Sequence, residues 1–258
     1  MSCFRLVSIQ AQFIAPVRPP AYPAGVKLRT IRLSLVAALI AMIAVFAGRA
    51  LYDRGYAQAA ADAEVYFKYH MLRAQTLEGQ ASKRPAGGVL VLGDSIVELQ
   101  NFTSLCGLPV FNAGISGLTT DRLAGLAPQL VAAARPRLVV VAIGANDTRR
   151  DAAVVPEDRW RAAYRKLLTA AGRRPVIVVG VQPIEKDKPG AALFDGPAMA
   201  ARSAVLARIA HAAGAAYVPP LASVQGLTVD GVHLNAEGDR RWQASVEAAC
   251  EKGKTPVT

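Results

Sequence analysis

Short apolar runs alternate with helical patterns from about residue 88 onward, and this alternation most constrains the fold. The apolar runs cover residues 89–92, 109–111, 138–143, 175–181 and 215–218. Helical patterns cover residues 119–135, 156–171, 197–213 and 235–250, with Pro156 near one start and Gly172 and Gly214 at two ends. Strands that alternate with helices form a parallel sheet covered on both faces. We therefore expect a three-layer α/β/α, doubly wound fold.

A first polar block, Gly93-Asp94-Ser95, directly follows the apolar run at residues 89–92. A short apolar run bounded by glycine is typical of a strand buried on both faces. Ligands of open α/β sheets bind at the carboxyl ends of such strands, so Ser95 is placed to act as a nucleophile. The alternative is an ordinary strand-to-helix turn with Asp94 and Ser95 as capping residues.

Two further blocks supply hydrogen-bond donors after the next strands. Residues 112–117 follow the second apolar run, and residues 144–147 follow the third. Gly117 has no side chain and can present its N–H to a reacting oxygen, whereas Gly114 is expected to be a turn residue. Asn146 can donate through its amide without carrying a charge. The alternatives are a glycine turn and an Asx-turn.

A fourth block pairs Asp230 with His233 in a loop before the final helix. A carboxylate three residues before a histidine can hold the imidazole in one tautomer and stabilise its protonated form. The alternative is a solvated loop with an incidental histidine. The other two histidines, His70 and His211, fall in helical stretches and are expected to be structural or exposed.

The four blocks in this order resemble the SGNH hydrolases, a branch of the GDSL esterase/lipase group. The resemblance extends over roughly residues 88–250. It implies a flavodoxin-like order of strands. It also implies that Ser95 attacks an acyl carbonyl, that His233 carries the proton, and that Asp230 orients His233.

The same resemblance assigns an oxyanion hole. Its donors would be the N–H groups of Ser95 and Gly117 and the side chain of Asn146. This chemistry requires no metal and no organic cofactor. The implied substrate is an ester of a small molecule, a lipid or a glycan.

The N-terminal part has a different character. Residues 1–32 carry five Lys and Arg residues, no Asp or Glu, and several prolines, as expected for a basic cytoplasmic leader. Residues 33–48 are continuously apolar or small. This segment is shorter than the roughly 20 residues that usually span a bilayer, but Arg32 and Arg49 can snorkel and lengthen it.

Basic residues before an apolar segment favour a cytoplasmic N-terminus. We therefore expect residues 33–48 to be a single-pass signal anchor in a bacterial inner membrane, with the catalytic domain in the periplasm. The alternative is a cleaved signal peptide and a secreted or periplasmic enzyme. Residues 49–84 are expected to form a helical stalk, and residues 85–258 the hydrolase domain.

The formal net charge of +11 does not indicate a nucleic-acid partner, because five of the charges lie in the leader and the rest are scattered. Cys3, Cys106 and Cys250 lack the spacing of zinc ligands. The last helix is expected to run from the active-site edge to the far edge of the sheet, where Cys106 precedes a strand. We therefore expect a disulfide between Cys106 and Cys250 in an oxidising compartment; the alternative is two separate buried thiols.

Together these features predict an exported, membrane-anchored serine ester hydrolase. An acyltransferase with the same triad would pass the acyl group to a sugar hydroxyl instead of water. A non-catalytic binding module on this fold is the other alternative. The loop at residues 182–197 is expected either to shape the substrate pocket or to be a surface insertion.

Overall fold

The computed structural model describes residues 28–153 and 155–252, and the chain divides into two compact units. The first unit ends at Asp62 and the second begins at Ala63. One long helix, α1 (Leu28–Ser82), contributes residues to both units. Residues 1–27 of the expected basic leader lie outside the described part of the chain.

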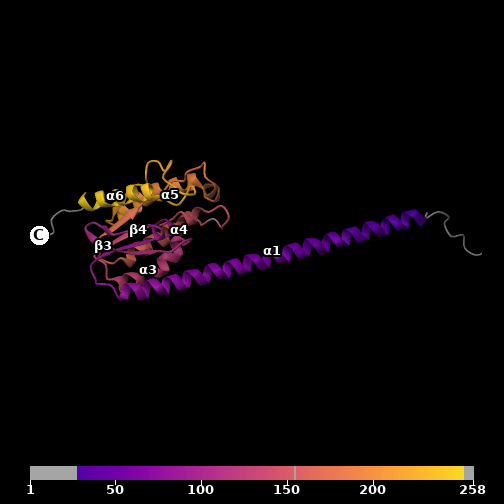
Figure 1. The fold of residues 1–258 in the computed structure, drawn as a ribbon, viewed down its shortest axis with the longest axis horizontal. Helices are drawn as coiled ribbons and strands as arrows, with labels where there is room; N and C mark the ends of the chain where they lie inside the picture. Colours follow the sequence, from indigo (N-terminus) through magenta and orange to yellow (C-terminus); the bar gives the residue numbers. More distant parts are fainter. Residues whose placement is uncertain (1–27, 154, 253–258) are drawn as a thin grey trace, which may run out of the picture. The chain divides into compact units, whose positions relative to one another are not determined.

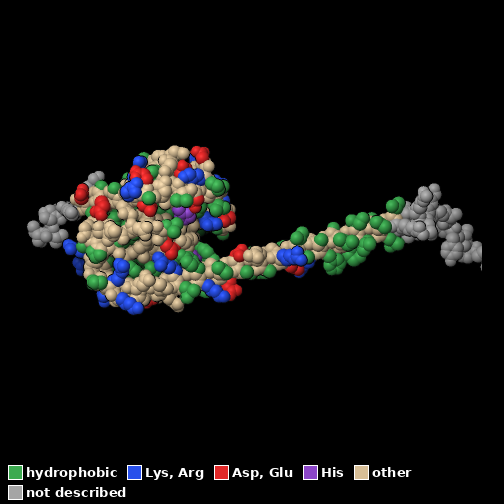
Figure 2. All heavy atoms as spheres, viewed as in Figure 1, with side chains coloured by type: hydrophobic (Ala, Val, Ile, Leu, Met, Phe, Trp, Pro, Cys, Tyr) green, Lys and Arg blue, Asp and Glu red, His purple; other side chains and the backbone are tan. Residues whose placement is uncertain are grey.

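The first unit contains the apolar stretch of α1. Its side chains from residue 33 to residue 62 are exposed, and hydrophobic ones gather along this part of the helix (Figure 2). The most apolar window of 18 residues has a mean hydropathy of 2.1, and none of it is buried against protein. By length and composition, the helix is therefore long and apolar enough to cross a membrane.

The second unit is built on a six-stranded sheet with the order β2-β3-β1-β4-β5-β6. The neighbouring strands β3, β1, β4, β5 and β6 run parallel to one another, while the short β2 pairs with β3 in the antiparallel sense. The strands are β1 (Val89–Gly93), β2 (Ser104–Leu105), β3 (Leu108–Gly114), β4 (Leu138–Ala142), β5 (Val176–Val179) and β6 (Ala216–Val218). The parallel strands thus have the flavodoxin-like order expected of a doubly wound sheet.

Helices cover both faces of this sheet. They are α2 (Ser95–Glu98), α3 (Thr120–Ala134), α4 (Glu157–Ala170), α5 (Gly196–Ala212) and α6 (Ala236–Lys252), with two 3₁₀ turns, η1 (Asn146–Thr148) and η2 (Pro189–Leu193). The helices α3 and α4 contact each other, and α6 contacts β5 and β6. Figure 1 shows α3 and α6 on opposite sides of the strands. The three-layer α/β/α prediction is therefore confirmed.

Three strands end together at the edge where the polar blocks begin. Gly93 at the end of β1 is in register with Gly114 of β3 and with Ala142 of β4. A Cβ on Gly93 would lie 2.5 Å from the Ala142 carbonyl oxygen, so no larger residue fits there.

Gly114 belongs to β3 and is not a turn residue, so that expectation is wrong. Its φ is not among the positive values of the chain. A Cβ at this position would lie 2.2 Å from the backbone nitrogen of Glu98. Glycine is required because the backbone of α2 passes this close to the end of β3.

The last turns of α1 pack into the second unit. Leu77 and Ala81 are fully buried in its hydrophobic core, and His70 is only 6% exposed. The second compact unit begins at Ala63, within the stretch that the sequence led us to expect as a stalk.

Cys106 and Cys250 are paired as a disulfide with a Cα–Cα distance of 5.5 Å. Cys106 and Gly107 form the two-residue turn between β2 and β3, and both have positive φ, as a type I′ hairpin turn requires. Cys250 lies near the end of α6. The bridge therefore ties the last helix to the start of β3.

The disulfide leads to a prediction about thiol content. Alkylation without reductant, followed by peptide mass mapping, should leave Cys106 and Cys250 unmodified and linked. Closing a loop of this length stabilises the fold by about 5 kcal/mol in the chain-entropy model, so reduction should lower the melting temperature. Two alkylated cysteines at these positions in protein from an oxidising compartment would contradict the pairing.

The buried end of α1 leads to a second prediction. Leu77→Ala should lower the free energy of unfolding by about 2–5 kcal/mol, because it leaves a cavity in the core. Leu72→Ala is the matched control, since Leu72 lies on the same helix and is 64% exposed. Thermal or urea denaturation of the full chain in detergent measures both. Equal effects of the two substitutions would show that the helix end does not contribute to the core.

Candidate active site

Ser95, His233 and Asp230 form a continuous chain of hydrogen bonds. The distance from Ser95 Oγ to His233 Nε2 is 2.8 Å, and that from His233 Nδ1 to Asp230 Oδ2 is 2.7 Å. Ser95 is the first residue of α2, directly after β1, whereas Asp230 and His233 lie in the loop between β6 and α6. The fold thus brings together residues that are 138 positions apart.

The carboxylate of Asp230 is held in its charged form. Its second oxygen accepts the backbone N–H groups of Val232 and His233 at 3.0 and 2.9 Å. Burial raises the pKa of Asp230, but these N–H groups and the imidazole outweigh it and lower the pKa to about 2. A charged Asp230 keeps the hydrogen on Nδ1, which leaves Nε2 free to accept the Ser95 hydroxyl.

The loop at residues 182–197 is hydrogen-bonded to the loop that carries Asp230 and His233. The carboxylate of Glu185 accepts hydrogen bonds from the Thr228 hydroxyl and, at 2.9 Å, from the Gly226 N–H. These two bonds, in that order, are the main causes that lower the pKa of Glu185 to about 2. The Gly190 N–H donates to the Asp230 carbonyl oxygen at 2.9 Å. The sequence did not identify Glu185, because its partners lie about 40 residues away in a different loop.

Asn146 and Gly117 lie on neighbouring loops at the same edge. Asn146, the first residue of η1, donates one amide hydrogen to the Leu118 carbonyl oxygen at 3.1 Å. A primary amide has two hydrogens, so one remains available to a ligand. Gly117 has a φ of +76°, and its N–H meets no acceptor among the described residues. Both the Asn146 amide and the Gly117 N–H are therefore available as hydrogen-bond donors to a ligand.

Glu98 links the first two polar blocks. Its Oε2 accepts hydrogen bonds from the backbone N–H and the hydroxyl of Ser116, each at 2.6 Å, and from Tyr69 at 2.6 Å. Its Oε1 is 3.1 Å from Nε of Arg73. Burial raises the pKa of Glu98, but these hydrogen bonds and the guanidinium lower it overall. No pattern in the sequence indicated this role of Glu98, because all three partners are distant along the chain.

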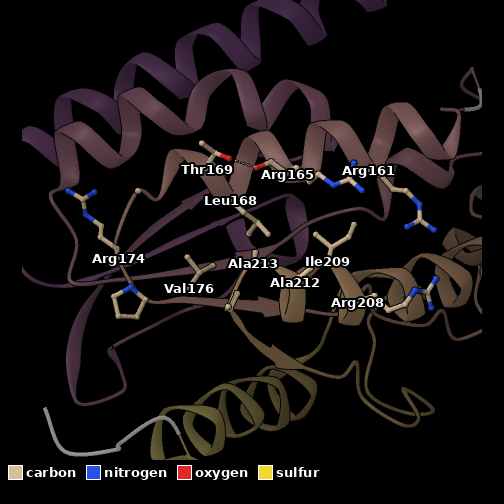
Figure 3. Close-up of a pocket in the computed structure, with 14 residues that line it drawn as sticks. Arg161, Arg165, Leu168, Thr169, Arg174, Val176, Arg208, Ile209, Ala212 and Ala213 are labelled. Carbon is tan, nitrogen blue, oxygen red and sulfur yellow. Dashed lines mark hydrogen bonds between the residues drawn. The ribbon is translucent and has the colours of Figure 1, made fainter.

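A cavity of about 580 Å³ lies at the other edge of the sheet (Figure 3). Arg161 and Arg165 from α4 and Arg208 from α5 lie along it, and Val176 marks the start of β5. None of the three hydrogen-bonded residues Ser95, His233 and Asp230 lines this cavity. It is separate from the candidate active site, which lies at the carboxyl ends of the strands.

Among the described residues, one group has the spacing of metal ligands: Cys106, Glu247 and Cys250. The two cysteines are paired with each other as a disulfide. The Glu247 carboxylate accepts the backbone N–H of Cys106 at 2.9 Å. Each of the three side chains therefore has a structural partner within the protein.

Asp94 is a buried carboxyl group directly before Ser95. It is 2% exposed, and its Oδ1 accepts the N–H of Ile96 at 3.0 Å, which caps α2. Burial raises the pKa of Asp94 from 3.8 to about 7, and the nearby Asp147 charge adds to this effect. The side chain therefore takes up a proton on folding at mildly acidic pH.

This raised pKa leads to a prediction about stability. A carboxyl group whose pKa is higher in the folded state contributes stability that is fully present below about pH 4 and is lost as the pH rises through about 7. Asp94→Asn should remove this loss, because the amide still accepts the Ile96 N–H and carries no charge. Melting temperatures of both proteins from pH 4 to pH 8 measure the difference. Parallel profiles would contradict the raised pKa.

The chain matches the GDSL-like lipase/acylhydrolase family over residues 91–241. A sequence comparison with curated proteins gives no match. Among solved structures, a Bacteroides fragilis protein assigned as an acylhydrolase is 23% identical, with a TM-score of 0.59, and the match covers 69% of this chain and 95% of the other.

Two further structures share the fold. A GDSL-like lipase from Bacteroides thetaiotaomicron is 23% identical, with a TM-score of 0.55 and coverage of 72% of this chain and 97% of the other. An acetyl xylan esterase, AlAXEase, is 18% identical, with a TM-score of 0.55 and coverage of 62% and 98%. The family match spans more than half of the chain, and the fold agrees with it. The chain therefore belongs to the GDSL-like lipase/acylhydrolase family, the SGNH hydrolases, and is an ester hydrolase.

Proposed function

We propose that Ser95, His233 and Asp230 are the catalytic triad of this ester hydrolase. The observation that carries the proposal is the unbroken chain of hydrogen bonds, with distances of 2.8 Å and 2.7 Å, that joins Ser95 Oγ to His233 and His233 to Asp230. In the reaction, Ser95 Oγ bonds to the carbonyl carbon of the ester, and His233 Nε2 takes the hydroxyl proton. The imidazolium then gives this proton to the leaving alcohol, and water releases the acyl group by the reverse route.

The oxyanion hole that we propose consists of the N–H groups of Ser95 and Gly117 and the side-chain amide of Asn146. These donors are fixed before the reaction, so they stabilise the negative charge as it develops on the carbonyl oxygen. The positive φ of Gly117 and the bond from Asn146 to the adjacent loop support this assignment. Uncharged donors suit an anion that exists only during the reaction.

We also propose that residues 33–48 anchor the enzyme in a bacterial inner membrane, with a cytoplasmic N-terminus and a periplasmic catalytic unit. The exposed apolar side chains of this segment and the basic residues before it support this orientation. The Cys106–Cys250 pair supports an oxidising compartment for the second unit.

We propose acetyl esters of glycans as the first substrates to test. The reasons are the envelope location and the shared fold of an acetyl xylan esterase. A series of chromogenic esters of increasing acyl length, compared with an acetylated glycan, gives the preference directly. A preference for long acyl chains would point to lipids, and acyl transfer to a sugar hydroxyl in excess over free acid would identify a transferase.

The triad predicts the effect of single substitutions on turnover. Ser95→Ala and His233→Ala should each lower kcat by about 10⁴-fold or more, and Asp230→Ala should lower it by less. Ser245→Ala is the control, since its exposed hydroxyl only donates to the Arg241 carbonyl. Rates with a chromogenic acetate and labelling by a fluorophosphonate probe measure the effects. Normal turnover in Ser95→Ala would disprove the mechanism.

The anchor predicts the topology of the chain. Alkaline phosphatase fused to the C-terminus should be active in a bacterial host, because it folds outside the cytoplasm. Alkaline carbonate should leave the full-length chain in the membrane pellet. Release of the full-length chain into the supernatant would rule out the anchor, and a shortened chain would show cleavage of a signal peptide.

A further inference from the structure

Side chains from one face of α1 donate hydrogen bonds to the end of β3 and to the loop after it, which contains Gly117. The Tyr66 hydroxyl donates to the Gly117 carbonyl oxygen, and His70 Nε2 lies 2.9 Å from the Ser116 carbonyl oxygen. Arg73 donates to the Gly114 carbonyl oxygen at 3.3 Å. Positions 66, 70 and 73 lie on one side of a helix because they are four and three residues apart. All of these residues belong to the second unit.

The bond from His70 determines where the Gly117 N–H points. The Ser116 carbonyl and the Gly117 N–H belong to one planar trans peptide group, in which they point in opposite directions. Holding the carbonyl oxygen on His70 therefore directs the N–H away from α1. The preceding peptide is held separately, because the Ser116 N–H donates to Glu98 at 2.6 Å.

His70 is present as one defined neutral tautomer. A carbonyl oxygen only accepts, so Nε2 must carry the hydrogen. The lone pair on Nδ1 then accepts from Arg122 Nη1 at 3.3 Å. Burial lowers the pKa of His70, and the Arg122 charge lowers it further, although the Ser116 carbonyl and Glu98 oppose this. Both ring nitrogens are therefore engaged, and the ring orientation is fixed.

Tyr66 holds His70 and Gly117 together. Its ring centroid is 3.8 Å from that of His70, in an edge-to-face arrangement. A Cβ on Gly117 would lie 2.8 Å from Cε2 of Tyr66, so the ring lies directly against this glycine. Glycine gives the loop a positive φ but leaves its peptide groups free to rotate. The Leu118 N–H closes the turn by donating to the Ile115 carbonyl oxygen at 3.2 Å, and His70 holds the central peptide between Ser116 and Gly117.

We propose that His70 is a positioning residue that orients the Gly117 N–H toward the reacting oxygen, with Tyr66 supporting it. The helix α1 then contributes to the geometry of the active site through the side chains of His70 and Tyr66, and is not only a connection to the membrane. The hydrogen bond to the Ser116 carbonyl also polarises the same peptide group and strengthens its N–H as a donor. This inference rests on the proposed roles of Ser95 and Gly117.

The test compares substitutions of His70 in the full-length chain in detergent. His70→Ala should lower kcat about 10- to 100-fold with little change in KM, because removing an oxyanion donor outright lowers kcat about 10²- to 10³-fold. His70→Gln should recover most of kcat, since its amide can donate to the Ser116 carbonyl. Tyr66→Phe, which keeps the ring, should lower kcat by less than His70→Ala. The control is Gln75→Ala, an exposed position on the same helix.

Melting temperatures and the Ser95→Ala protein complete the design. Unchanged kcat in His70→Ala would overturn the inference. Equal losses of activity and melting temperature in His70→Ala and His70→Gln would also overturn it, because they would indicate a structural role alone. If Ser95→Ala is inactive while His70→Ala is normal, only this inference fails. Turnover by Ser95→Ala would instead remove the proposed function on which the inference rests.

Discussion

The whole site depends on three parallel strands that end side by side. Gly93, Gly114 and Ala142 are in register across β3, β1 and β4, and the polar blocks start immediately after them. The backbone comes so close here that a Cβ on Gly93 would meet the Ala142 carbonyl at 2.5 Å, and one on Gly114 would meet Glu98 at 2.2 Å. The close approach of Gly114 to Glu98 places α2, with Ser95 at its start, directly over the strand ends.

Two carboxylates, Glu98 and Glu185, hold the loops that follow the strands. Glu98 ties the end of α2 to Ser116, and Glu185 ties the loop after β5 to Thr228, which precedes Asp230 and His233. Glu185 is buried and Glu98 is half-buried, and each accepts several hydrogen bonds and has a cationic neighbour, which offsets the cost of removing its charge from water. These hydrogen bonds hold the loops together with apolar packing, because Ile115, Leu118 and Val232 of the same loops are buried in the core.

The last turns of α1 belong to the second unit and not only to the apolar N-terminal region. Its buried face contributes Leu77 and Ala81 to the core, and its polar positions meet the loop around Gly117. The same helix also contains the apolar segment that is long enough to cross a membrane. The proposed membrane anchor and the proposed positioning residues therefore belong to one helix.

The sequence predicted the fold class, the family and the strands and helices of the second unit except the short β2 and α2. Apolar periodicity is a local property, and each polar block stands next to the strand that positions it, as Gly93-Asp94-Ser95 does after β1. The roles of Tyr66, His70, Glu98 and Glu185 were decided only by the tertiary structure. Their partners lie between 18 and 51 residues away, at separations set by how whole elements pack and not by any local pattern. A histidine on an otherwise ordinary helix carries no sign in the sequence of which distant carbonyl it will meet.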